Sequence, residues 1–271
     1  MKNWKPNAII GVEEIYGTST SPIRVDTNVG KGILKIPSGC GGTDRLISEF
    51  IGSCLAKWLG IEMPNFTLIR TGSDFVKIMQ VLDGTRAERA DGFISQYEKA
   101  FSLTPQSIDD VENTDIFTKL VFLDTWTRNP DRFLKQTDGS AHNILLVENG
   151  QKRKPYTAKA IDYSEAFRVY DEVFDMKNHF GTQAINDDRI FGQLAMFNQY
   201  LDPNVAEQVA TQLANVNQDE IQLFMGEIPK SWNLNAKMKK AFVSFIVKRA
   251  NFVAHTLINK LCLNKSLFFR P

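Results

Sequence analysis

The spacing of apolar residues changes along this chain, and that change limits the folds that it can adopt. The first third holds short apolar runs typical of strands, such as PIRVDTN (22–28) and GKGILKIP (30–37), separated by the turn signal Asn28-Val29-Gly30. The last hundred residues instead repeat apolar positions at helical spacing. The pattern predicts an α+β protein with a strand-rich first part and a helical last part.

The same reading predicts the individual elements. A helix is expected over residues 42–60, where Thr43 or Asp44 begins the apolar repeat and Gly60 ends it. A second helix is expected over 114–129 with Thr114 as its cap. The remaining expected elements are strands over 66–70, 75–82, 142–149 and 157–163, and helices over 188–201, 203–216, 219–228 and 235–261. The polar segment 82–92 is the best linker candidate, so we expect an N-lobe over 1–85 and a C-lobe over 86–271.

Charge and cysteine content exclude several classes of protein. The formal net charge is +1 with no long block of one sign, which does not support direct nucleic-acid binding. Cys40, Cys54 and Cys262 are an odd number without a C-x-x-C pair, which argues against a disulfide framework and a structural zinc site.

No segment favours a membrane protein. The N-terminus lacks the apolar core of a signal peptide, and the late apolar run is interrupted by Lys248, Arg249 and His255. The sequence therefore predicts a cytoplasmic protein without membrane contact.

Several polar residues stand at the borders of the expected strands. Phosphoryl transfer needs a lysine for the nucleotide phosphates, a carboxylate that holds it, an aspartate for the attacking hydroxyl, and oxygen ligands for Mg²⁺. The chain supplies these in kinase order: Lys35, Glu49, Asp131 or Asp138, Asn143 and Asp162. This order predicts a nucleotide cleft between a small lobe and a larger helical lobe.

Three motifs carry a resemblance to a known family. FLDTWTRNPDR (122–132), HNILL (142–146) and AIDYSEAF (160–167) resemble the HipA-like kinase family, in particular its short single-domain members. LAKWLGIEMPNF (55–66) and the late EIPKSW (227–232) are similar as well. The resemblance implies a bilobal protein-kinase-like fold, ATP- and Mg²⁺-dependent phosphorylation of serine or threonine in a protein substrate, and a toxin that modifies a translation component and has an antitoxin partner chain.

The resemblance also implies roles for single residues. Lys35 paired with Glu49 would bind the ATP phosphates, and Asn143 with Asp162 would bind Mg²⁺. The base is open between Asp138, five residues before Asn143 as in ordinary protein kinases, and Asp131, twelve before it. We favour Asp131, because it follows a helix within a few residues and a base must be held rigidly.

Two further nucleotide contacts are expected. The loop GTSTSPI (17–23) lacks G-x-G-x-x-G, but backbone N–H groups near Gly17 and Ser19 could cradle phosphate. In HipA-like kinases a serine in this loop is autophosphorylated, which points to Ser19, Thr20 or Ser21. Gln80, beside Met79, is a candidate for the adenine pocket at the lobe junction.

Two other functions fit the same pattern. A kinase-like fold can act as a catalytically weak nucleotide-binding or interaction module, which the Asp131–Asn143 spacing and the poor glycine loop favour. A lipid or small-molecule phosphotransferase would share much of the scaffold. The absence of a basic amphipathic segment argues against the lipid substrate.

Overall fold

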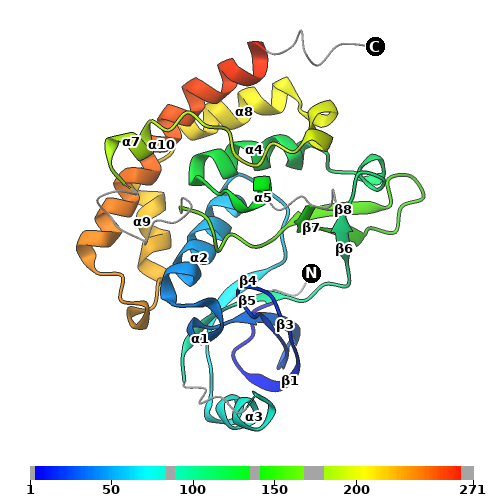
Figure 1. The fold of residues 1–271 in the computed structure, drawn as a ribbon, viewed down its shortest axis with the longest axis vertical. Coiled ribbons are helices and arrows are strands. Elements are labelled where there is room, and N and C mark those ends of the chain that lie inside the picture. The colour runs from blue at the N-terminus through cyan, green and yellow to red at the C-terminus, as the bar shows by residue number, and fades with distance from the viewer. Residues whose placement is uncertain (1–3, 84–88, 135–140, 168–179, 264–271) are drawn as a thin grey trace. The chain divides into compact units, whose positions relative to one another are not determined.

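The structure, a computed structural model, describes residues 4–83, 89–134, 141–167 and 180–263 of the chain (Figure 1). These residues form two compact units. The first unit comprises Met1–Phe50, Pro64–Lys99 and Ile228–Asn233, and the second comprises Ile51–Met63, Ala100–Glu227 and Leu234–Pro271. The chain thus passes from one unit to the other several times, and the lobes expected over 1–85 and 86–271 stay a prediction.

A five-stranded antiparallel sheet is the centre of the first unit. Its strands, in spatial order, are β1 (Ile9–Ile15), β2 (Ile23–Thr27), β3 (Gly30–Lys35), β5 (Asp91–Gln96) and β4 (Phe66–Arg70). β2 and β3 form the expected hairpin, and β3 lies in the middle of the sheet with Lys35 as its last residue, opposite Phe93 of β5. The short α1 (Pro37–Cys40) follows, and α2 (Thr43–Trp58) begins in this unit.

Helix α3 (Ser73–Asp83) packs beside β1, where the apolar run 75–82 predicts a strand. Phe75 and Met79 are four residues apart and buried in the core of this unit, whereas Val81 and Leu82 are exposed. This alternation follows the period of a helix, which a short apolar run does not reveal by itself. The strand prediction is therefore wrong, and α3 and β5, which lie on either side of the predicted linker, both belong to the first unit.

A short piece of late sequence completes the first unit. The 3-10 turn η3 (Lys230–Trp232) places the Trp232 ring in the interior, with 2% of the residue exposed. Trp232 Nε1 donates to the backbone oxygen of Asp91 at 2.9 Å, and Ser231 donates to the Asp91 carboxylate. The start of β5 is therefore fixed by residues about 140 positions later in the sequence.

Helix α4 (Asp115–Thr127) is the centre of the second unit. Nearly every residue from Ile116 to Thr127 is buried, as expected for a helix that is apolar on all sides. Thr114 occupies the N-cap position, but its side chain makes no capping hydrogen bond. α4 packs against α8 (Pro203–Ala214) and α10 (Ala236–Leu263), and α9 (Gln218–Glu227) packs on α10 (Figure 1).

A small antiparallel sheet accompanies these helices. Its strands are β6 (Phe101–Leu103), β7 (Ala141–Glu148) and β8 (Tyr156–Ala160). The remaining elements of this unit are η1 (Ile108–Asp110), α5 (Asp131–Leu134), α7 (Thr182–Ile185) and η2 (Ala195–Tyr200). The predicted helix over 188–201 is reduced to η2, because Gly192 has a left-handed φ of 71° and Leu194 is extended.

By length and composition, one helix among the described residues could cross a membrane, over Ala236–Ile258 of α10. Half of that segment is buried inside the unit, and the core helix of a soluble protein meets the same test. Trp126 Nε1 of α4 donates to the backbone oxygen of Ile246 at 2.8 Å. α10 is therefore a packed helix of this unit.

Trp232 gives a direct test of the late segment's role. We expect Trp232→Ala to lower the free energy of unfolding by about 3–5 kcal/mol, because a large buried ring is removed. Trp232→Phe keeps most of the ring but leaves the Asp91 carbonyl without its donor, so it should cost about 1–3 kcal/mol. Urea unfolding followed by circular dichroism measures both; an unchanged midpoint for Trp232→Ala would contradict the packing.

Candidate active site

A buried ion pair joins the end of β3 to α2 in the first unit. Lys35 Nζ lies 2.7 Å from Glu49 Oε2, and the two residues are only 7% and 3% exposed. Glu49 lies on the face of α2 that also buries Leu46 and Phe50. The structure therefore brings together two of the predicted site residues, and a charged pair is kept where an apolar pair would cost less to bury.

The loop at Gly17 packs on the turn that follows β3. Cys40 Sγ donates to the backbone oxygen of Thr20 at 3.6 Å, and Arg45 Nη1 donates to that of Ser19 at 3.2 Å. Ser19 is exposed, Thr20 is buried, and Ser21 has a left-handed φ of 37°. Of the three hydroxyl residues, Ser19 is the most accessible. Gly17 is also exposed, with open space where a Cβ would lie.

Gln80 does not occupy the predicted strand. It is an exposed residue of α3, on the side opposite Phe75 and Met79. Because the helix turns its side chain to the surface of the first unit, the strand geometry on which the adenine assignment depended is absent.

In the second unit, Asp131 and Asn143 are in direct contact. Asn143 Nδ2 donates to Asp131 Oδ2 at 2.7 Å, across the twelve-residue separation. Asp131 begins α5, and its backbone N–H donates to the side-chain oxygen of Asn129 at 3.2 Å. Asn143 thus holds the Asp131 carboxylate, and Asn129 holds the backbone of the same residue. Asp138, the alternative base, lies outside the described residues.

Asp162 follows β8 in a tight turn. Its φ of 59° is left-handed, and its Oδ1 accepts from the backbone and hydroxyl of Ser164, at 3.3 and 2.7 Å. The preceding residue, Ile161, donates its N–H to the backbone oxygen of Asn143 at 3.0 Å. The strand ends that carry Asn143 and Asp162 are therefore bonded to each other.

Two charged residues that the sequence reasoning left without a role lie beneath this turn. Asp124 of α4 is fully buried, and its Oδ2 accepts from Arg132 Nε at 2.7 Å. Burial raises the pKa of Asp124, and the hydrogen bonds from Arg132 and Asn129 oppose that rise. Burial alone would lower the pKa of Arg132, but the charge and hydrogen bond of Asp124, together with Tyr163 and Asp162, outweigh burial, so the pKa is raised.

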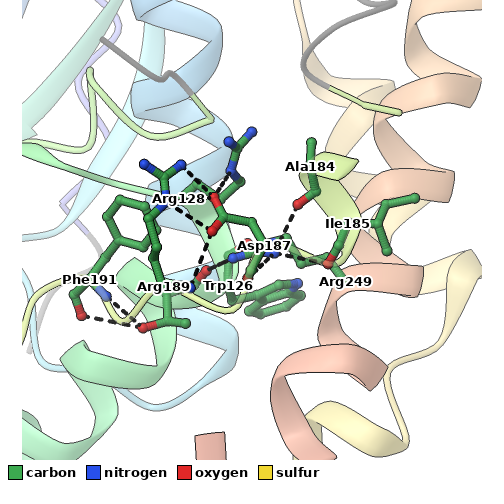
Figure 2. Close-up of polar contacts among 9 residues, drawn as sticks. Trp126, Arg128, Ala184, Ile185, Asp187, Arg189, Phe191 and Arg249 are labelled. Atoms are coloured by element: carbon green, nitrogen blue, oxygen red, sulfur yellow. Dashed lines mark hydrogen bonds and ion pairs between the residues drawn. The ribbon is translucent and has the colours of Figure 1, made fainter. Parts of the chain in front are cut away.

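A second arginine network holds the end of α4 (Figure 2). Arg249 of α10 is fully buried and donates to the backbone oxygens of Thr125 at 2.7 Å and Trp126 at 3.0 Å, and to those of Ala184, Ile185 and Asp187. Burial lowers its pKa to about 9, so it remains cationic at neutral pH. These carbonyls include ones that a helix terminus leaves without partners.

Asp187 forms ion pairs with two further arginines next to this network. Its carboxylate lies 3.1 Å from Arg128 Nε and 2.6 Å from Arg189 Nη2 (Figure 2). Although burial opposes the shift, hydrogen bonds from Arg189 and the charge of Arg128 lower the pKa of Asp187 to about 2. Arg128 ends α4 with a left-handed φ of 52°, directly before Asn129.

One sequence signal could have exposed Asp124. It is a charged residue in a helix whose apolar residues, such as Leu120, Val121 and Leu123, leave no side exposed to solvent. A buried carboxylate of this kind needs a cationic partner that is buried beside it. Arg132 is that partner.

The side chains present suit a magnesium ion. Asn143 uses its amide nitrogen toward Asp131, so its amide oxygen is the atom that can face a cation, and Asp162 offers a carboxylate. Mg²⁺ prefers one or two such hard oxygens together with substrate phosphates. Among the described residues, no group of three or more His, Cys, Asp or Glu side chains forms a self-contained metal site. This donor set fits an ion that arrives with a nucleotide.

Asp187 should make the free energy of unfolding depend on pH in the acidic range. Because its folded pKa of about 2 lies below the ordinary 3.8, its stabilisation is complete above pH 3.8 and is lost as pH falls through 2. We expect Asp187→Asn to be less stable than the wild type at pH 6, with the gap shrinking from pH 4 to pH 2. Urea midpoints at each pH measure this; a constant gap would contradict the ionic role.

Comparisons with known proteins bear on the fold and the family of the chain. No curated protein matches the chain. The Helicobacter pylori proinflammatory kinase CtkA is 14% identical, with 95% of this chain and 97% of that chain covered and a TM-score of 0.59. The Shewanella oneidensis MR-1 toxin–antitoxin system HipA, HipB and its operator DNA complex gives 12% identity, 96% and 68% coverage and a TM-score of 0.43.

The similarity to CtkA shows a kinase-like α+β fold; the sequence pattern predicts its α+β class, and the family resemblance implies its kinase-like form. A family model described as HipA-like kinase matches residues 36–260, which is well over half of the chain and includes Asp131, Asn143 and Asp162. The chain therefore belongs to the HipA-like kinase family.

Proposed function

We propose that this protein is an ATP- and Mg²⁺-dependent protein kinase that phosphorylates serine or threonine. The contact between Asp131 and Asn143 carries the proposal. It brings a candidate base and a candidate metal ligand, twelve residues apart in the sequence, within one hydrogen bond of 2.7 Å. Such a pair is what transfer of a phosphoryl group to a hydroxyl requires.

Each residue has a separate task in the proposed reaction. Asp131 accepts the proton of the attacking hydroxyl, and the amide of Asn143 fixes the direction of its carboxylate. Asn143 and Asp162 would hold Mg²⁺, which when bound neutralises charge on the nucleotide phosphates. Lys35 supplies a second positive charge to those phosphates, and Glu49 fixes its ammonium group.

Transfer of phosphate to the protein itself or to a cellular substrate tests the reaction. With Mg²⁺ and γ-labelled ATP, we expect Asp131→Asn to lower the rate by about 10²–10⁴-fold, the usual contribution of a general base. Asp162→Asn should lower it as well, whereas Asp138→Asn should keep it. Asp219→Asn, on the outer face of α9, is a matched control for loss of one carboxylate.

The opposite pattern assigns other roles. Loss of transfer in Asp138→Asn with full transfer in Asp131→Asn would move the base to Asp138. ATP binding without transfer in the wild type would favour the nucleotide-binding module. Transfer to a lipid or a small molecule, but to no protein, would replace the protein substrate.

We further propose that the kinase acts in the cytoplasm as a toxin, neutralised by an antitoxin chain and directed at a component of translation. The proposal depends on membership of the HipA-like family. Induced expression should arrest growth, and Asp162→Asn should restore it at an equal protein level. Equal growth of both strains would contradict the toxin role and leave the kinase proposal intact.

A further inference from the structure

The side chain of Arg132 is buried at the point where three segments of the second unit meet. The residue is 4% exposed, and its guanidinium lies 5.2 Å from the centre of the Tyr163 ring. Nε donates to the carboxylate of Asp124, as described above. Nη1 donates to the backbone oxygen of Asn143 at 2.7 Å and to that of Ile161 at 3.3 Å.

Those two carbonyls belong to the segments that hold the proposed metal ligands. One is the carbonyl of Asn143 itself, and the other immediately precedes Asp162. One nitrogen atom of Arg132 thus fixes the backbone at both ligands, in addition to the direct bond from Ile161 N to Asn143 O.

Asp124 connects this arginine to the candidate base. Its Oδ1 accepts from Asn129 Nδ2 at 3.0 Å, and Asn129 in turn accepts from the backbone N–H of Asp131. Gly192 leaves room for the carboxylate, since a Cβ there would lie 2.5 Å from Asp124 Oδ2. The same carboxylate therefore orients the base through Asn129 and the ligand backbone through Arg132.

We propose that Asp124 and Arg132 are positioning residues, which set the geometry of Asp131, Asn143 and Asp162 without touching substrate. The proposal rests on the proposed function of these three residues. A planar guanidinium can donate to a carboxylate and to two carbonyls in fixed directions, whereas the single ammonium of lysine cannot reproduce that fork. Loss of the fork should loosen the metal ligands more than the fold.

A second buried arginine provides a matched control. Arg249 is also fully buried and donates to backbone carbonyls, but to those of Thr125, Trp126 and the segment Ala184–Asp187. None of its bonds in the described residues reaches Asn143 or Ile161. Arg249→Lys therefore reports the general cost of replacing a buried arginine, and Arg132→Lys reports that cost together with any effect on the site.

The test measures ADP affinity, thermal midpoint and the rate of transfer over a range of Mg²⁺ concentrations. ADP affinity is expected to rise with Mg²⁺, and the readout is the Mg²⁺ concentration that gives half of this rise. We expect Arg132→Lys to raise that concentration by about 10–100-fold, the usual effect of losing support behind a metal ligand. ADP affinity in EDTA should stay unchanged. Arg249→Lys should lower the thermal midpoint without moving the Mg²⁺ requirement. Equal Mg²⁺ shifts in both variants, or no shift in Arg132→Lys, would overturn the proposal.

A second variant, Asp124→Asn, tests the proposal if Arg132→Lys does not fold. Asp124→Asn keeps the shape of the side chain and can still accept one hydrogen bond, so it should give a smaller Mg²⁺ shift in the same direction. A folded Asp124→Asn with the Mg²⁺ requirement of the wild type would overturn the proposal.

The readouts separate this proposal from the proposed function. If the wild type transfers no phosphate but binds ADP more tightly with Mg²⁺, phosphoryl transfer fails, and a weakened Mg²⁺ response in Arg132→Lys still supports positioning. If ADP affinity in the wild type does not respond to Mg²⁺, the metal ligands are misassigned and the positioning proposal is overturned with them.

Discussion

The buried ion pair between Asp124 and Arg132 is the interaction on which the second unit depends. A carboxylate inside an apolar helix costs several kcal/mol unless a cation compensates it, and removing one partner of such a pair typically costs about 3–5 kcal/mol. Here the cation comes from α5, eight residues along the chain. The pair thus requires α4 to stop at Arg128 and the chain to turn back through Asn129, which places Asp131 beside the strand end at Asn143.

The same requirement explains why the charged interior of this protein is concentrated near its candidate functional residues. In the first unit the buried pair of Lys35 and Glu49 joins the central strand to a helix. In the second unit Arg249 compensates carbonyls at the end of α4, and Asp187 compensates Arg128. Apolar residues could replace the Lys35–Glu49 and Asp124–Arg132 pairs at lower cost, so the charges retained there agree with a functional role, whereas Arg249 supplies hydrogen-bond donors that an apolar residue lacks.

Much of the fold could be read from residue spacing, because long periodic segments carry a strong signal. The helices α2, α8, α9 and α10 and the strands β2, β3, β4, β7 and β8 lie where the pattern predicts them. Short apolar runs were ambiguous. FVKIMQVL reads equally well as a strand, and only its packing against β1 shows that it is the helix α3. The expected helix over 188–201 was lost at Gly192, which has a left-handed conformation beside Asp124.

By itself, the sequence determined the α+β class, the order of the polar residues and the family, since spacing and motifs are local properties of the chain. Tertiary structure decided which of those residues meet. It brought Asp131 into contact with Asn143, twelve positions away, and left Gln80 exposed. It also paired Asp124 with Arg132, which no sequence motif indicates. The physical reason is that a buried charge pairs with the opposite charge that lies nearest in three dimensions. The separation of two residues in the sequence does not give that distance.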